Sequence, residues 1–82
     1  MNLLTKRLSE IPNNVECKIF GFESDLDVHS EQSLLSLGFV PGTLVCVEHR
    51  APLGGALAVR LRGGLLALRT NLASKILIGL KD

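Results

Sequence analysis

Glycine and proline are concentrated in one part of this chain, and this concentration limits its fold more than any other feature. Six of the 8 glycines and two of the 3 prolines lie within residues 34–69. Glycine accepts positive φ values and proline fixes φ near about −65°, so both residues favour tight turns. The sequence therefore predicts that this stretch folds as a close series of turns joining short elements.

The chain has 82 residues, which predicts one domain over residues 1–82. A hydrophobic content of 46% is enough for a globular core. No apolar run has the length of a membrane span and the start lacks the features of a signal peptide, so we expect a cytoplasmic protein without direct membrane insertion. A net charge of +1 and an aromatic content of 4% argue against nucleic-acid binding.

Hydrophobic periodicity predicts a mainly β fold. A short helical turn is expected at the N-terminus, where Leu4, Leu8 and Ile11 share one face. A second short helix is predicted over Ser30–Leu37, with Ser30 as its N-cap and Gly38 as its left-handed stop. Five strands are expected, over residues 15–22, 43–49, 57–62, 65–69 and 75–80. Strands of this kind predict a small closed or nearly closed β-barrel, because closure removes exposed edges.

Alternation within the strands predicts which residues face the core. In the second strand, His49 is expected on the same face as Val45 and Val47. In the first strand, one face carries Val15, Cys17, Ile19 and Gly21, and the other, which we expect to be partly covered, carries Phe20 and Phe22.

The third and fourth strands form the clearest predicted hairpin. Gly63 and Gly64 suit a two-residue type I′ turn, which needs positive φ at both central positions. This turn predicts the pairs Arg62–Leu65, Leu61–Leu66, Arg60–Ala67 and Val59–Leu68. The apolar members of these pairs then point inward, and three arginines point outward, namely Arg60, Arg62 and Arg69.

The sequence contains no catalytic motif, so we do not expect an enzyme. Cys17 and Cys46 form no C-x-x-C pair and are expected to be buried thiols in a reducing compartment. The acidic stretch Glu23–His29 lacks the glycine and final glutamate of a calcium loop, so we interpret it as a solvated loop before a helix. Weak transition-metal binding has four candidate ligands, His29, His49, Asp27 and Glu48.

Two surface features have both a structural and a functional interpretation. The three outward arginines either solvate a strand face or form a docking patch for an acidic partner. Leu53, between turn-forming residues, either closes the mouth of the barrel or contacts a partner.

Several ordered segments together resemble the FeoA (ferrous iron transport protein A) family. They begin with Leu-Ser-Leu-Gly-Phe-Val-Pro-Gly-Thr at residues 35–43 and continue with Arg-Ala-Pro-Leu-Gly at 50–54. Val-Arg-Leu-Arg-Gly at 59–63 and Leu-Ala-Leu-Arg at 66–69 complete the set. The resemblance extends to the opening Leu-Ser-Glu-Ile at 8–11, so it covers nearly the whole chain.

This resemblance implies a small Src-homology-3-like β-barrel with an inserted helix, and a cytosolic accessory of bacterial ferrous iron uptake that needs no cofactor. It implies a permease partner, ferrous iron transport protein B, contacted through its cytoplasmic part. The candidate contact surfaces are the helix 31–37 and the residues Ala51, Pro52, Leu53, Gly54, Arg60, Arg62 and Arg69. The helix start Ser30–Ser33 lacks the family's usual basic residues, and Gly55-Ala56 replaces a frequent Asp-Pro, so contacts there are expected to differ.

Two other functions are compatible with the sequence. The same barrel resembles the C-terminal domain of iron-dependent repressors, so a metal-responsive regulatory module using the four candidate ligands is the alternative. A nucleic-acid-binding barrel is disfavoured by the near-neutral charge and the shortage of aromatic residues.

Overall fold

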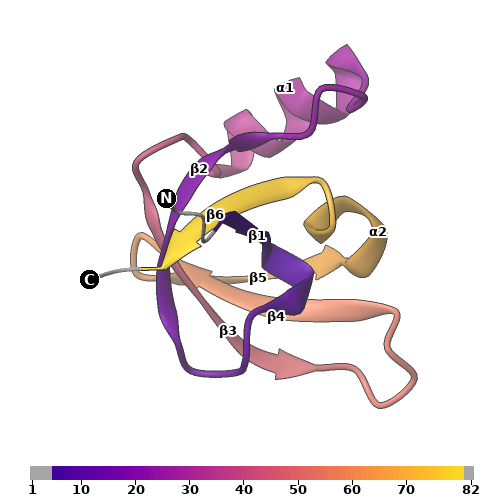
Figure 1. The fold of residues 1–82 in the computed structure, drawn as a ribbon. Helices are drawn as coiled ribbons and strands as arrows, with labels where there is room; N and C mark the ends of the chain where they lie inside the picture. Colours follow the sequence, from indigo (N-terminus) through magenta and orange to yellow (C-terminus); the bar gives the residue numbers. More distant parts are fainter. Residues whose placement is uncertain (1–4, 81–82) are drawn as a thin grey trace.

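The computed structural model describes residues 5–80, which form six strands and three short helices (Figure 1). In chain order these are β1 (Thr5–Arg7), the 3-10 helix η1 (Leu8–Glu10), β2 (Glu16–Phe22), α1 (Val28–Leu37), β3 (Leu44–Arg50), β4 (Ala56–Leu61), β5 (Gly64–Arg69), α2 (Thr70–Ala73) and β6 (Ile76–Leu80). No helix among these residues is long and apolar enough to cross a bilayer.

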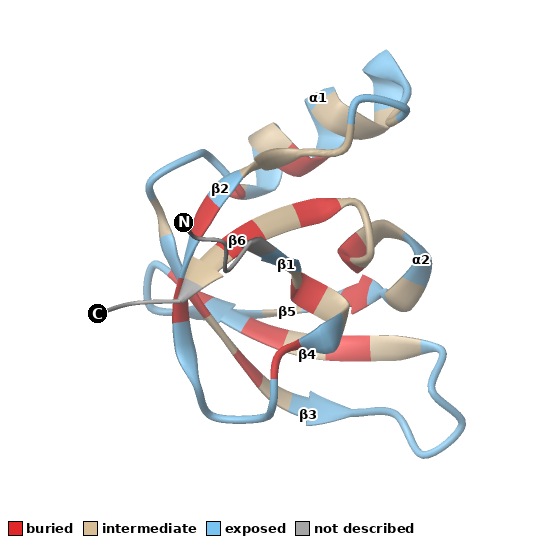
Figure 2. Cartoon of the chain, viewed as in Figure 1, coloured by how far each residue is buried: buried red, intermediate tan, exposed pale blue. Residues whose placement is uncertain are grey.

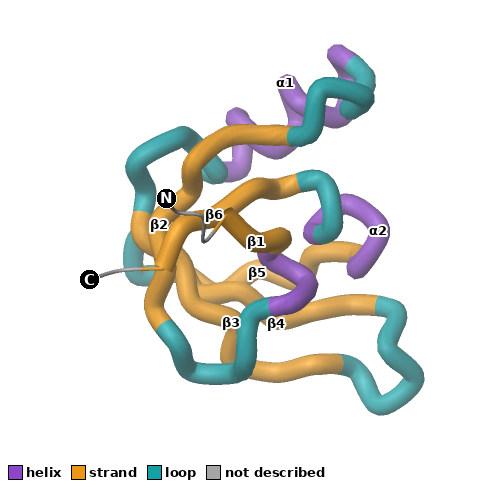
Figure 3. The backbone as a smooth tube through the Cα atoms, viewed as in Figure 1, coloured by secondary structure: helices purple, strands orange, loops and turns teal. Residues whose placement is uncertain are grey.

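All six strands belong to one antiparallel sheet with the order β1-β6-β2-β3-β4-β5. The sheet curls around a single core, as the tube in Figure 3 shows, and this confirms the predicted mainly β, barrel-like fold. Within residues 5–80 the curl does not close, because β1 pairs only with β6 and β5 pairs only with β4. The fold therefore has one strand more than predicted and two edge strands.

The core lies inside the curled sheet and beneath the short helices (Figure 2). The helix α1 projects from the barrel and buries one side chain, Leu34. Phe39, which follows α1, is fully buried and is the largest residue of the core. The other core residues are Leu8, Ile11, Cys17, Ile19, Val45, Val47, Leu57, Val59, Leu61, Leu68, Ala73, Ile76 and Ile78.

The ends of α1 show one correct and one wrong prediction. Its N-cap is Asp27 and not Ser30, because the Asp27 carboxylate accepts the main-chain N–H of Ser30 at 3.0 Å. Its stop is Gly38 as predicted, with φ of 106°. The N–H of Phe39 then bonds the carbonyl of Leu34 at 3.0 Å, which satisfies the helix end and turns Phe39 into the core.

Two β-bulges change the predicted faces of the first strands. The ladder between β2 and β6 shifts between Ile19 and Gly21, and Phe22 then lies opposite Ile76 and packs against the core. Phe20, at the bulge, is 70% exposed. The ladder between β3 and β4 shifts between Val47 and His49, so His49 is exposed and does not share the buried face as predicted.

The hairpin of β4 and β5 forms as predicted, but with another register. Its turn is Arg62-Gly63, with φ values of 51° and 78°, and not Gly63-Gly64. Leu61 therefore pairs with Gly64 and Val59 with Leu66. Each β4 residue pairs two positions earlier on β5 than predicted, and an even shift leaves the inward and outward faces unchanged.

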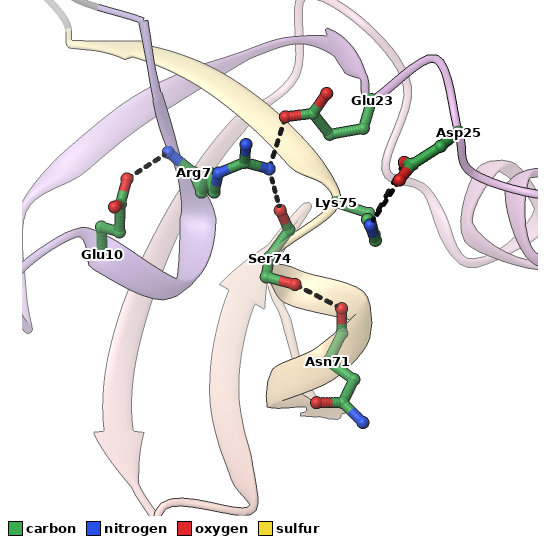
Figure 4. Close-up of polar contacts among 7 residues, drawn as sticks. All are labelled: Arg7, Glu10, Glu23, Asp25, Asn71, Ser74 and Lys75. Carbon is green, nitrogen blue, oxygen red and sulfur yellow. Dashed lines mark hydrogen bonds and ion pairs between the residues drawn. The ribbon is translucent and has the colours of Figure 1, made fainter.

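The predicted N-terminal helical turn is present as the 3-10 helix η1, and Leu8 and Ile11 are both buried as expected. Leu4 lies outside the described residues, and the strand β1 stands between it and η1. Arg7 joins these elements to the other end of the chain (Figure 4): its guanidinium donates to the carbonyl of Ser74 at 2.8 Å and pairs with Glu23. Its N–H also donates to the Glu10 carboxylate at 3.0 Å.

The acidic loop before α1 is tied down by the same region. Lys75 donates to the carboxylate of Asp25 at 3.0 Å, next to the Arg7–Glu23 pair (Figure 4). This bond from Lys75 lowers the pKa of Asp25. The loop that was predicted to be only solvated therefore anchors the start of α1 to the turn before β6.

Candidate docking site

The loop between β3 and β4 presents Leu53 to solvent on an ordered turn. The N–H of Gly54 donates to the carbonyl of Ala51 at 2.8 Å, and the N–H of Ala51 donates to the carbonyl of Ala56 at 2.9 Å. Gly54 takes the positive φ, 79°, that continues the chain after this turn. Leu53 at the tip is 99% exposed, which excludes the interpretation that it closes the barrel.

Thr70, the first residue of α2, holds this loop from the other side. Its main-chain N–H donates to the carbonyl of Gly55 at 3.1 Å, and its hydroxyl donates to the carbonyl of Gly54 at 2.7 Å. The loop is thus bonded at both ends and within its turn, so the backbone that carries Leu53 is held in place. The role of Thr70 was not predictable from the sequence, because the two segments are 16 positions apart and no local pattern joins them.

A shallow groove of about 260 Å³ lies beside the loop on the outer face of the sheet. The hollow exists because the side chains on this face are small. Ala58 lies opposite Ala67 in the sheet register, and Ala56 lies two positions before Ala58 on the same face of β4. The complete lining is His49, Arg50, Ala51, Ala56, Leu57, Ala58 and Ala67. This groove was not predicted, although the alternating alanines of β4 are a visible signal in the sequence.

The three predicted arginines are exposed, but the structure does not bring them into one patch. Arg60 is paired with Glu48, with a second contact at 3.1 Å, and this bond lowers the pKa of the carboxylate. Arg62 lies in the β4–β5 turn and donates to the Thr43 hydroxyl at 3.4 Å. Arg69 lies at the loop end of the sheet, opposite Ala56, and bonds no carboxylate among residues 5–80.

Arg50 gives the groove a positive wall that no carboxylate of the described chain neutralises. Its guanidinium donates to the carbonyls of Ser9, at 3.0 Å, and Ile11, and to the side-chain oxygen of Asn13 at 3.1 Å. These neutral acceptors fix the side chain but leave its charge in place. The site thus combines an apolar tip, a small-residue hollow and cationic groups.

The four candidate metal ligands lie in two separate sequence-adjacent sets. Asp27 and His29 lie at the start of α1, where bonds from the side chain and main chain of Ser30 lower the pKa of Asp27. Glu48 and His49 lie on β3, and Glu48 is engaged by Arg60. No three histidine, cysteine or acidic side chains within residues 5–80 come together as a metal site.

Both cysteines are free thiols. Cys17 is fully buried, and burial, followed by the charges of Cys46 and Glu16, raises its pKa to about 11. Cys46 is half-buried, so the prediction of burial is correct only in part for it. The bulge in β3 leaves Cys46 and His49 on the same face by register, opposite Arg60 and Ala58, but no bond between the two side chains is present.

Further exposed apolar side chains lie outside the loop. The candidate helix 31–37 shows Leu37 at its end, and Val28 at the start of α1 is 73% exposed. The barrel adds Val15, Phe20, Val40, Leu44 and Leu65. Of these, Leu65 on β5 lies on the outer face that also carries Ala67.

Comparisons with solved structures find close fold matches. A FeoA-like protein from Clostridium acetobutylicum is 28% identical, with a TM-score of 0.85 over 99% of this chain and 92% of that one. FeoA from Stenotrophomonas maltophilia, solved with zinc and described as an SH3 domain protein, is 29% identical, with a TM-score of 0.74 over 88% of this chain and 87% of that one. A comparison with curated protein sequences found no match.

The fold also occurs within larger proteins. A manganese-dependent transcriptional repressor matches 99% of this chain with a TM-score of 0.86, but at 16% identity and over 44% of the repressor. This likeness shows a shared fold. The sequence itself matches the FeoA domain family over residues 6–79. Because this match covers almost the whole sequence, the chain belongs to the FeoA family.

Proposed function

We propose that this chain is a non-enzymatic accessory protein of bacterial ferrous iron uptake that docks on the cytoplasmic part of ferrous iron transport protein B. The observation that carries the proposal is Leu53, which is 99% exposed on a turn that Thr70 fixes in place. Because the backbone of the turn is already ordered, binding costs little backbone conformational entropy there, which favours affinity. The part of the proposal that concerns ferrous iron uptake is supported by membership of the FeoA family.

The docking surface has three parts. The turn Ala51–Gly54 provides the apolar contact, the groove receives partner side chains, and Arg69 provides a charge without a carboxylate partner in residues 5–80. Arg60 and Arg62 lie nearer the opposite end of the β4 and β5 strands and contribute less, because each is engaged by a neighbour. The protein acts in the cytoplasm, reaches the inner face of the membrane through the permease, and needs no cofactor and no nucleic acid.

Titration with the soluble G-domain of the permease, with and without guanine nucleotide, tests the proposal. Burying Leu53 contributes about 1.5–3 kcal/mol, so Leu53→Ser is expected to weaken the complex about tenfold or more. No binding in either nucleotide state, together with normal ferrous uptake in cells that lack this protein, would contradict the proposal.

A metal-responsive regulator is the second candidate, since a zinc-bound relative and a manganese-dependent repressor share the fold. The ligands would be Asp27 with His29, or Glu48 with His49, each completed by water or a partner. Calorimetric titration with zinc or ferrous iron tests it. Binding that is lost in His29→Ala or His49→Ala would support this function, and no heat at near-millimolar metal would exclude it.

A further inference from the structure

The strand β5 is an edge strand with a free main-chain side. In antiparallel pairs, hydrogen-bonded positions alternate with positions whose N–H and C=O point away from the partner strand. The two-residue turn Arg62-Gly63 closes on the pair Leu61–Gly64, which makes this pair hydrogen-bonded. The bond from the N–H of Thr70 to the carbonyl of Gly55 continues the same alternation at the far end.

The alternation leaves three residues of β5, Leu65, Ala67 and Arg69, with their N–H and C=O groups directed away from β4. No strand within residues 5–80 pairs with this side, and no turn or loop bond reaches Leu65 or Ala67. Arg69 is the N-cap of α2, so its C=O accepts the first bond of that helix and it offers only its N–H on this side. Leu65 is 48% exposed, and Ala67 and Arg69 are exposed as well. This row of unpaired groups is a template for another extended chain.

The side chains of these three residues lie on the outer face of the sheet, and each favours a particular kind of side chain on a neighbouring strand. Ala67 continues the hollow that begins at Ala58, so a strand beside it must supply a large apolar side chain to fill the space. Arg69 offers a positive charge without a carboxylate among the described residues, so the opposite position must be acidic. Leu65 favours an apolar residue opposite.

A second copy of this chain does not supply the whole pattern, because β5 contains no acidic residue to set opposite Arg69 in any register. Two β5 strands related by a two-fold axis through Ala67 would set alanine opposite alanine, leaving the hollow empty, and would set Arg69 opposite Leu65. The other edge strand, β1, has the sequence Thr-Lys-Arg and would add positive charge beside Arg69. The edge strands of this chain are therefore poor partners for β5.

We propose that β5 accepts an extended segment of a different protein by strand addition, and that this segment carries an acidic, a large apolar and a smaller apolar residue at alternate positions. The acidic residue lies opposite Arg69 and the large apolar residue opposite Ala67. This inference rests on the proposed docking function and adds the form and chemistry of the partner segment.

Short synthetic peptides test the inference on the full chain labelled with ¹⁵N. One peptide alternates Glu, Phe and Val with Thr, and its matched control has Lys in place of Glu. We expect the Glu peptide to shift the amide signals of Leu65, Ala67 and Arg69 and to slow their hydrogen exchange, and to bind at least tenfold more tightly than the Lys peptide. Equal binding of both peptides, or shifts confined to other elements, would overturn the inference.

Three variants sharpen the test. Ala67→Pro removes an edge N–H that β4 does not use, so it should abolish peptide binding with the β4–β5 ladder intact in the amide spectrum. Arg69→Glu reverses the charge at the edge and should make the chain prefer the Lys peptide to the Glu peptide. This variant keeps the inference testable if Ala67→Pro does not fold. Lys18→Glu makes the same charge change on β2 and should leave binding unchanged.

The permease G-domain separates the two proposals. If the G-domain binds and Leu53→Ser weakens it while Ala67→Pro does not, the G-domain does not bind by strand addition and docking through the loop stands. If the Glu peptide binds at β5 but the G-domain does not, the edge site stands and the permease is not its partner.

Discussion

The hydroxyl of Thr70 donates a hydrogen bond of 2.7 Å to the carbonyl of Gly54 and joins the start of α2 to the loop that carries Leu53. The neighbouring bond from the Thr70 N–H to the carbonyl of Gly55 lies just beyond the last pair of the β4–β5 ladder and depends on the backbone alone. The hydroxyl bond depends on the side chain. Thr70 is therefore the one position in this contact where a substitution can loosen the loop and leave the sheet intact.

Thr70→Val is expected to loosen the loop without unfolding the protein. Loss of this largely exposed hydrogen bond costs about 0.5–1.5 kcal/mol of unfolding free energy. Hydrogen exchange of the amides of Ala51 and Gly54 should accelerate, because their turn loses an anchor. Thr70→Ser keeps the hydroxyl and should restore slow exchange. Unchanged exchange in Thr70→Val would show that the turn orders itself without this bond.

Leu53→Ser should separate binding from stability. Because Leu53 is 99% exposed, its replacement is expected to change the unfolding free energy by less than about 0.5 kcal/mol. Affinity for the permease G-domain should fall as described above. Phe20→Ser removes another exposed apolar side chain, on β2, and serves as the matched control. An equal loss of affinity in both variants would indicate general surface hydrophobicity and not a docking loop.

Local signals in the sequence were sufficient to predict most elements. Gly38 and Gly42 stand where the chain needs positive φ, and both take it, at 106° and 95°. The turn before β3 is closed by a bond from the N–H of Thr43 to the carbonyl of Val40 at 3.0 Å. Such features depend on a few neighbouring residues, so the sequence displays them directly.

The N-cap of α1 was a local error, since Asp27 accepts the N–H of Ser30 three positions further on. The other wrong predictions depend on contacts between distant residues. At the bulges near Phe20 and before His49, one strand has an extra residue relative to the strand with which it pairs. Such a mismatch involves two strands, so the pattern of one strand does not show it. The hairpin turn lies at Arg62-Gly63, although Gly63-Gly64 has the better local propensity for it. The observed register pairs Leu57 with Leu68, and both side chains are buried. The loop Ala51–Gly54 was predicted as a contact surface, but the hydrogen bonds from Thr70 that hold it and the groove beside it were not.

Gly38→Ala is expected to destabilise the fold through its backbone alone. A Cβ at this position would meet Leu61 at 3.5 Å, which is ordinary contact, but the φ of 106° is unfavourable for alanine. The cost should be about 1–2 kcal/mol in chemical denaturation. Gly55→Ala is the control, because Gly55 has open space around it and no positive φ, so its stability should change little. Equal effects of the two substitutions would contradict this account of the helix stop.

Cys17 and Cys46 should differ in reactivity and in their effect on stability at high pH. Cys17 is buried with a pKa raised from 9.0 to about 11, so a thiol reagent should modify Cys46 first and Cys17 only after unfolding. In the unfolded chain Cys17 ionises near its ordinary value, so the unfolded state loses its proton at lower pH than the native state. The unfolding free energy should consequently fall as the pH rises from about 9 to 11. Cys46→Ser should retain this decline and Cys17→Ala should reduce it, as measured by urea denaturation across that range. An equal decline in both variants would assign it to other groups.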